Sequence, residues 1–476
     1  MKTMNKISIN DIGKIFGILL ILTILSIMSY QIYANFIIYI NSDNHLLLHH
    51  VYENNIYLGD RICANENRFL PLQYFDWNIL RIFNKDFRYL LFPFYIIIKF
   101  LITVFLFIYI IKDFEKFNKT KLIFPIKLLL VLFFIIYWGN AWLTMEITYA
   151  EITQGIFVLL FILFYQRGYF TNKFKYYILA LLSCIYATYM KETMFIPFFV
   201  IGIANLLFLD KKNNSTRMVN LLLILNGIIY LISYYLVYRS CYGKAYYKYA
   251  DEQILFQPFY LFHFLTFFSA ILGYNFIKNR KLSFYDSFLL SADGYVFVMY
   301  IILGFKWIYY YHIAYILLCV FLIYYITNCS KYMKYFIYFL MLFHILINIE
   351  PSFNYYKIQN IKRKFGKEFI YNFKDNDIIN LYNYNFYDNV FKAYHKYLFN
   401  KDKNVINFDS YTDEDVINKI IKLPTKEYIV IIKEDDNKIN LFNNEKIKQK
   451  YHLYKINTGK PIIYGMNTFL LSFYNY

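Results

Sequence analysis

Long apolar stretches follow one another along the first three quarters of the chain. A helix that crosses a bilayer needs about 20 mostly apolar residues, and windows of that length recur from Ile15 to Ile349. We predict eleven such spans, at residues 15–38, 90–111, 122–143, 149–165, 176–190, 193–209, 218–238, 256–277, 283–304, 307–327 and 332–349. The pattern thus predicts a polytopic α-helical membrane protein, with a multi-span domain over residues 1–350.

One apolar run, from Tyr176 to Leu209, has two interpretations. It is interrupted only by Lys191-Glu192, so it is either one over-long helix or two short helices. Lys and Arg gather on both sides of the run, and cytoplasmic loops collect these residues. Because both flanks then belong to the same side of the membrane, we predict that the run crosses twice and turns at Lys191.

The same rule orients the whole domain. Basic residues concentrate in the short segments before the first span and after every second one. These segments are predicted to be cytoplasmic, so the N-terminus lies inside and, after an odd number of spans, the C-terminus lies outside. The net charge of +18 then reflects topology and attraction to anionic lipid head groups, and we do not expect nucleic acid as a partner.

The composition changes at about Pro351, after which charged residues are frequent. Short apolar runs at 378–381, 405–408 and 427–432 alternate with an amphipathic run and with a helix that starts at Asp413. Thr412 followed by three acidic residues is a typical helix start, because a hydroxyl caps free N–H groups and acids favour the positive helix end. We predict that residues 351–476 form a small extracytoplasmic α/β domain.

Overall composition narrows the function classes. Hydrophobic residues make up 59% of the chain and charged residues 17%, which excludes a soluble globular enzyme. The five cysteines form no metal-binding pattern. Cys63 and Cys241 fall in predicted external loops, where a disulfide between them is an alternative to free thiols.

Ionisable residues near the external ends of the spans are the candidate site residues. A charge at membrane depth costs roughly 2.5–3.5 kcal/mol on insertion scales, so each one needs a reason. The first external loop, residues 39–89, holds Asp43 just past a span end, followed by Glu66 and Arg68. Glu151 begins the fourth span and has no basic neighbour in its own turn.

Further candidates lie in the next external turns. Lys191-Glu192 forms the third turn, where an ion pair between the adjacent residues is the structural alternative. Arg239 opens a basic, tyrosine-rich loop, and His312 follows three tyrosines. Carboxylates suited to proton abstraction and cations suited to a phosphate leaving group thus share one predicted face, as sugar transfer from a polyprenyl-phosphate carrier requires.

This layout resembles the multi-spanning GT-C glycosyltransferases, which include protein O-mannosyltransferases and lipid A aminoarabinose transferases. The resemblance implies an acidic residue in the first external loop, matched by Asp43, and another at the second external turn, matched by Glu151. The segment 67–71, Asn-Arg-Phe-Leu-Pro, looks like the Gly-Arg-Phe-x-Pro segment of bacterial members, and Lys191-Glu192 looks like the Lys-Glu that enters their sixth span. Asp43-Asn44 departs from the family's Asp-Glu pair, which leaves the use of a divalent cation open and the metal ligands unassigned.

We therefore predict a glycosyltransferase of the bacterial inner membrane that transfers a sugar from a polyprenyl-phosphate donor to a glycan or lipid acceptor of the cell envelope. Asp43 is the predicted general base, and Glu151 is predicted to orient the acceptor or a metal. Arg68 and Lys191 are predicted to hold the donor phosphate. The other candidate substrate-binding residues are Glu66, Glu192, Arg239 and His312.

Three alternatives stay open, one of which is a scaffold of the envelope machinery that has no catalytic activity. A polysaccharide polymerase is the nearest alternative enzyme. A transporter or flippase of lipid-linked glycan is the alternative from another class, with Asp286 and Asp293, both inside a predicted span, as its candidate proton relay.

Overall fold

The computed structural model describes most of the membrane domain and parts of the tail. The described residues are 22, 26, 70–145, 150–209, 213–240, 259–279, 282–304, 308–372, 375, 377–380, 404–407, 412–424, 428–431, 440, 441 and 443–451. Among these residues the chain divides into two compact units, the first ending at Tyr356 and the second beginning at Lys357. The candidates Asp43, Glu66 and Arg68 lie outside the described residues, as do Cys63, Cys241 and all but two residues of the first predicted span.

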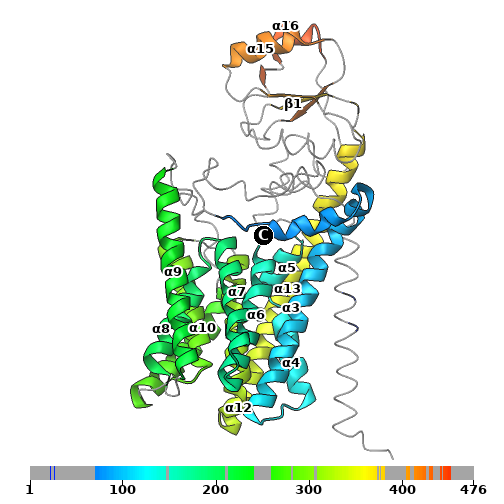
Figure 1. Cartoon of the computed structure of the whole chain (residues 1–476). Coiled ribbons are helices and arrows are strands. Elements are labelled where there is room, and N and C mark those ends of the chain that lie inside the picture. Colours follow the sequence, from blue (N-terminus) through cyan, green and yellow to red (C-terminus); the bar gives the residue numbers. More distant parts are fainter. Residues whose placement is uncertain are drawn as a thin grey trace, which may run out of the picture. The chain divides into compact units, whose positions relative to one another are not determined.

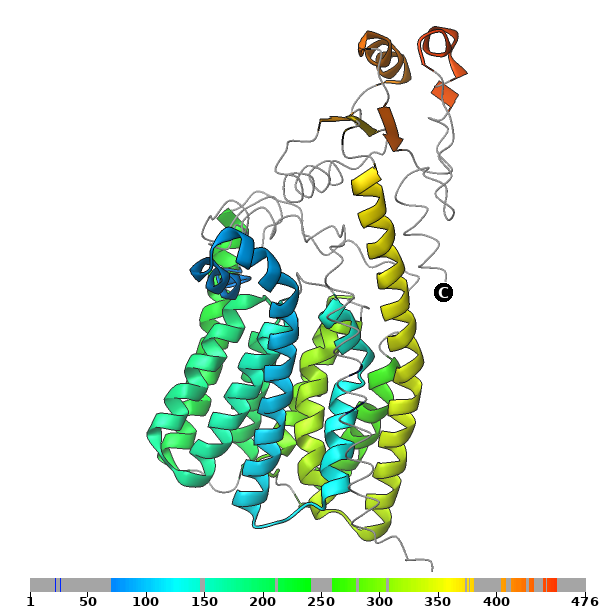
Figure 2. The same ribbon diagram turned by 90° about the vertical axis from the view of Figure 1, so that its right-hand side faces the viewer.

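The long helices of the first unit run side by side (Figures 1 and 2). In chain order its helical elements are η1 (Phe75–Ile82), α3 (Lys85–Asn118), α4 (Phe124–Ile135), α5 (Trp138–Met145), α6 (Glu151–Thr171), α7 (Phe174–Met190), α8 (Phe195–Phe208), α9 (Asn214–Ser240), α10 (Phe259–Asn279), α11 (Asp286–Val296), η4 (Phe297–Ile302), η5 (Ile308–Tyr311), α12 (His312–Asn328) and α13 (Lys331–Asn372). Helix α13 belongs to this unit as far as Tyr356.

The lengths and composition of these helices are those of a membrane protein. Six of the described helices are long and apolar enough to cross a bilayer, or seven if the bent pair of α4 and α5 is one span. Helices α7 and α8, with 17 and 14 residues, are apolar but shorter. The chain is thus a helical membrane protein, and the count of eleven spans stays a prediction.

The apolar run from Tyr176 to Leu209 is divided where its two polar residues stand. Helix α7 ends at Met190, and α8 begins at Phe195 after a turn in which the Met194 N–H donates to the Lys191 carbonyl oxygen at 3.0 Å. The run therefore forms two helices, as the basic residues on its flanks indicate.

The predicted span at residues 122–143 is bent, which its composition does not indicate. Helices α4 and α5 meet at an angle of 59°. The Asn140 side chain donates to the carbonyl oxygens of Phe134 and Ile135 at 2.6 and 3.3 Å, and the Trp138 N–H donates to Asn348 Oδ1 at 3.0 Å. These side chains satisfy backbone groups that the break frees, which is the condition for interrupting a helix inside a membrane.

An ion pair and a hydrogen bond between α3 and α6 establish the relative direction of these helices. Near their C-terminal ends, Asp113 of α3 pairs with Arg167 of α6. Toward their N-terminal ends, Lys99 of α3 donates to Thr153 of α6 at 3.1 Å. The two helices therefore run in the same direction, and the N-terminus of α6 lies at the end of the bundle where the first predicted external loop joins α3.

The second unit contains three short parallel strands in the order β2-β1-β3. The strands are β1 (Asp377–Asn380), β2 (Val405–Asn407) and β3 (Tyr428–Ile431), and the helices are α15 (Asp413–Lys422) and α16 (Glu445–Lys448). Thr412 caps α15, with its hydroxyl accepting from the Asp415 N–H and the Asp415 carboxylate accepting from the Thr412 N–H. The side of the membrane on which the second unit lies stays a prediction.

Candidate functional site

Two candidates that are 40 residues apart in the sequence form a buried ion pair. Glu151 is the first residue of α6, and Lys191 follows the last residue of α7. The Lys191 ammonium pairs with Glu151 Oε1, and it also lies 4.3 Å from the centre of the Tyr310 ring. Glu151 is 3% exposed and Lys191 is 7% exposed. The Glu151 carboxylate is thus paired with a cation of the next predicted external turn, and neither charge is left unpaired in a poorly hydrated position.

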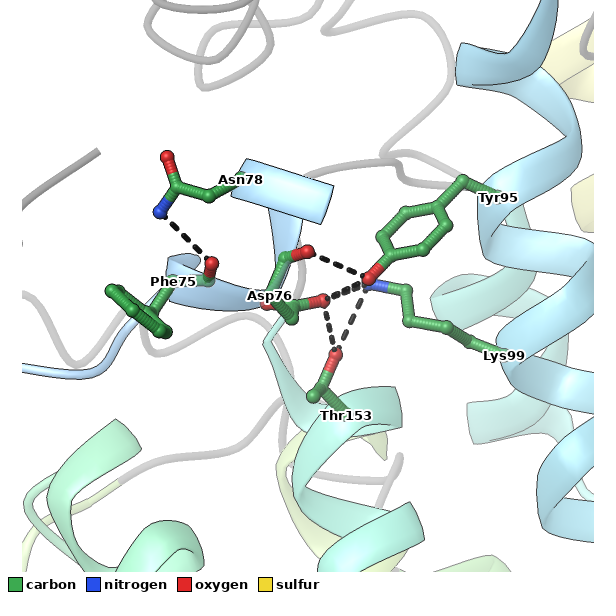
Figure 3. A network of polar contacts seen from close by, with 6 residues as sticks. All are labelled: Phe75, Asp76, Asn78, Tyr95, Lys99 and Thr153. Carbon is green, nitrogen blue, oxygen red and sulfur yellow. Dashed lines mark hydrogen bonds and ion pairs between the residues drawn. The ribbon is translucent and has the colours of Figure 1, made fainter. Parts of the chain in front are cut away.

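A second buried ion pair holds the end of the first predicted external loop (Figure 3). Lys99 Nζ lies 3.0 Å from Asp76 Oδ2, which also accepts hydrogen bonds from Tyr95 Oη and Thr153 Oγ1, both at 3.1 Å. Tyr95 Oη is also 2.9 Å from the Asp76 carbonyl oxygen. The ammonium lies 4.6 Å from the ring centres of both Trp77 and Tyr95. One carboxylate therefore joins η1, α3 and α6.

Sequence reasoning missed Lys99 and did not assign a role to Asp76. Lys99 lies inside the predicted span at residues 90–111 and is 3% exposed. A lone lysine in an otherwise apolar stretch was the available signal, because an ionisable residue at membrane depth needs a partner. Which acid supplies that partner depends on how the loop folds back onto α3, and local sequence does not contain this information.

The two ion pairs are adjacent because both use the first turn of α6. Glu151 takes part in one pair and Thr153, two residues later, in the other. The Leu72 N–H also donates to the Tyr189 carbonyl oxygen at 3.1 Å, two residues before Lys191. Segments from three predicted external turns therefore meet at one end of the bundle.

His312 lies next to the same face of α6. It is 1% exposed, and neither ring nitrogen has a hydrogen-bond partner among the described residues. Its Nε2 atom would be 2.7 Å from a Cβ atom at Gly155, one helical turn after Glu151 on the same face. Both polar atoms of Gln154 also have no partner within the described part of the chain. Buried polar groups are usually hydrogen-bonded, so each of these calls for a partner such as a water molecule or a ligand.

A glycine substitution tests this packing. Gly155→Ala is expected to destabilise the protein by about 1–3 kcal/mol, since the added methyl group must displace the His312 ring in a filled core. Gly273→Ala in α10 is the matched control, because nothing lies within 4 Å of the place that its added methyl group would take, and a gain of up to about 1 kcal/mol is expected from helix propensity. Thermal unfolding of both variants in the same detergent measures the difference; equal melting temperatures would contradict the close contact.

The remaining candidates are placed as follows. Glu192 is 7% exposed beside Lys191. Arg239 lies in the last turn of α9, where the position of its side chain is not described. The predicted base Asp43 stays a prediction, together with Glu66 and Arg68.

The described residues do not form a metal site. No group of three or more His, Cys, Asp or Glu side chains among them is arranged to hold a metal ion. The charge of Glu151, the candidate for orienting a metal, is balanced by the Lys191 ammonium.

The two acids of the transporter alternative have local partners. Asp286 Oδ2 accepts from the Ser283 N–H at 2.7 Å, and Asp293 Oδ2 accepts from Ser269 Oγ at 2.6 Å. The first contact stabilises the start of α11, and the second ties α11 to α10. Both carboxylates thus have a role in helix packing.

The chemistry available at this end of the bundle is that of paired, buried acids and amines. An anionic ligand can displace the Glu151 carboxylate from the Lys191 ammonium, and the released carboxylate can then accept a hydrogen bond from a hydroxyl group. No family model, curated protein or solved structure matches the chain, so its function is inferred from these residues.

Proposed function

We propose that this protein is a membrane glycosyltransferase of the GT-C kind, which transfers a sugar from a polyprenyl-phosphate donor to a glycan or lipid acceptor of the cell envelope. One observation carries the proposal: the buried Glu151–Lys191 pair, at the end of the bundle that also binds the end of the first loop. Such a site combines a cation for a phosphate with a carboxylate for a hydroxyl, and it does so where a lipid-linked substrate is available.

In the proposed reaction, the donor phosphate replaces Glu151 as the partner of Lys191. Arg68 supplies a second cation to the same phosphate. The freed Glu151 carboxylate accepts a hydrogen bond from the acceptor and orients it. Cations held at a leaving phosphate stabilise the charge that develops as the bond to the sugar breaks.

The bond changes balance without a further reactant. The acceptor oxygen forms a bond to the anomeric carbon, while the bond between that carbon and the phosphate oxygen breaks. The proton of the acceptor hydroxyl passes to the Asp43 carboxylate, and polyprenyl phosphate leaves with the electron pair. A correctly placed general base contributes about 10²–10⁴ to the rate of such a step.

The proposal includes a topology. Eleven spans place the N-terminus in the cytoplasm and the tail outside, in the inner membrane of a bacterium. The Glu151–Lys191 end of the bundle then faces outward, where donors carrying their sugar on the external leaflet can reach it.

Labelling of single cysteines tests this topology. In a cysteine-free background we expect Ile82→Cys, at a position that is 80% exposed, and Gly459→Cys to react with an impermeant thiol reagent on intact cells. Asn172→Cys, exposed after α6 at the other end of the bundle, is the matched control and is expected to react only after permeabilisation. Labelling of Asn172→Cys but not Ile82→Cys on intact cells would reverse the orientation and remove the extracytoplasmic site.

A transfer assay tests the activity itself. The purified protein is placed in lipid nanodiscs with a set of polyprenyl-phosphate sugars and with glycan and lipid acceptors from a bacterial envelope. Acceptor-dependent release of polyprenyl phosphate, followed by mass spectrometry, supports the proposal. The proposal would be contradicted if polyprenyl phosphate were released from none of the donors. It would also be contradicted if the protein moved intact donor between the leaflets of vesicles without an acceptor.

A further inference from the structure

Two of the three N–H donors of the Lys99 ammonium group are already hydrogen-bonded within the protein. An ammonium group has three N–H donors, and Lys99 directs hydrogen bonds to Asp76 Oδ2 at 3.0 Å and to Thr153 Oγ1 at 3.1 Å. The Trp77 and Tyr95 rings cover it from 4.6 Å each, and the side chain is 4% exposed. The protein itself thus supplies the partners of Lys99, which has no exposed approach for a substrate phosphate.

The position of Lys99 in α3 makes it energetically unfavourable for this side chain to carry a charge. The candidate span in α3 begins at Phe94, so Lys99 lies about 7.5 Å further along the helix at 1.5 Å per residue. Insertion of a lysine at membrane depth is unfavourable. A buried ion pair is weak evidence for added stability, and its best-attested use is to select one arrangement over others.

The segment whose arrangement the Asp76–Lys99 pair selects is Leu70–Phe83, which contains η1. Asp76 is bound through both its carboxylate and its carbonyl oxygen, and Tyr95 contributes to both contacts. Trp77 is buried, with its ring edge-on to Tyr95 at 4.7 Å between centres. At the start of the segment, Leu72 is bound to the end of α7, next to Lys191.

We propose that Asp76 and Lys99 are positioning residues that hold the segment Leu70–Phe83 against α3, α6 and the end of α7, and so set the affinity for the donor. This inference rests on the proposed function, because Arg68, the proposed second cation for the donor phosphate, precedes Leu70 by two residues in the sequence. The pair acts through the placement of this segment and does not contact the reacting atoms.

Hydrogen exchange tests the placement without any donor. In Lys99→Met, amides of peptides covering residues 70–83 are expected to exchange at least about 10-fold faster in nanodiscs, while peptides of α12 keep their rates. Lys127→Met is the matched control: it removes a lysine from an ion pair with Glu115 at the opposite end of α3 and is expected to leave exchange in 70–83 unchanged. Unchanged exchange in Lys99→Met would overturn the positioning role.

The second readout is the steady-state kinetics of transfer, measured with a donor that the protein uses as a substrate. Lys99→Met is expected to raise KM for the donor at least about 10-fold and to change kcat less than about 3-fold. A loss of kcat at constant KM would instead assign Lys99 to the chemical step and overturn the proposal. Lys99→Arg keeps the charge and is expected to restore part of the lost affinity.

A milder variant covers the case in which Lys99→Met does not fold. Tyr95→Phe removes one hydroxyl group and leaves both charges paired, and it is expected to speed exchange in 70–83 about 3-fold. No change in Tyr95→Phe would also count against the proposal. If the unmodified protein turns over no donor, only the proposed function is contradicted. The positioning role is tested separately, because the exchange measurement needs no donor.

Discussion

Lys191→Met is expected to abolish donor-dependent transfer and to destabilise the protein. Transfer falls at least about 100-fold because the cation that stabilises the departing phosphate is lost. The free energy of unfolding falls by about 3–5 kcal/mol, because Glu151 keeps a buried charge without its partner. The pair is suited to this test, since both residues are almost fully buried.

A double variant separates the two effects. Glu151→Gln combined with Lys191→Met leaves no buried charge, so its melting temperature is expected to return to within a few degrees of that of the unmodified protein. Its transfer activity is expected to stay at the level of Lys191→Met. Thermal unfolding in detergent and the transfer assay measure both quantities on the same preparations. A double variant that regains transfer would show that Lys191 does not act on the donor.

Asp43→Asn is expected to lower transfer by about 10²–10⁴ while leaving the protein folded. The amide has nearly the shape of the carboxylate but cannot take the acceptor's proton. The transfer assay measures the loss at saturating donor, where the effect falls on kcat. The melting temperature and the elution volume in gel filtration are expected to match those of the unmodified protein.

Asp60→Asn is the matched control, because it makes the same substitution in the same predicted external loop at a residue with no proposed role. Its transfer rate is expected to stay within about 2-fold of the unmodified rate. Turnover of Asp43→Asn near the unmodified rate would reject Asp43 as the base and move the search to the acids that the structure describes, with Glu151 first.

Much of the architecture follows from local sequence. Whether a segment enters a membrane depends on its own length and composition, so each apolar window after the first coincides with one or more described helices. The turn at Lys191-Glu192 was predictable for the same reason, since basic residues on both flanks require the run to cross twice. The cap at Thr412 was predictable because it involves residues three positions apart.

Tertiary structure decided which polar groups meet. Local sequence marks Glu151 and Lys191 as residues that need partners, but it does not indicate that they are each other's partners. It gives no sign that Asp76 would reach Lys99 inside α3, or that Asn140 and Asn348 would support a bend within a predicted span. These contacts depend on which helices are neighbours, and neighbours are selected by packing between segments far apart in the chain. Hydropathy thus determined the membrane character of this protein, whereas the juxtaposition of its buried charges was decided by the packing of its helices.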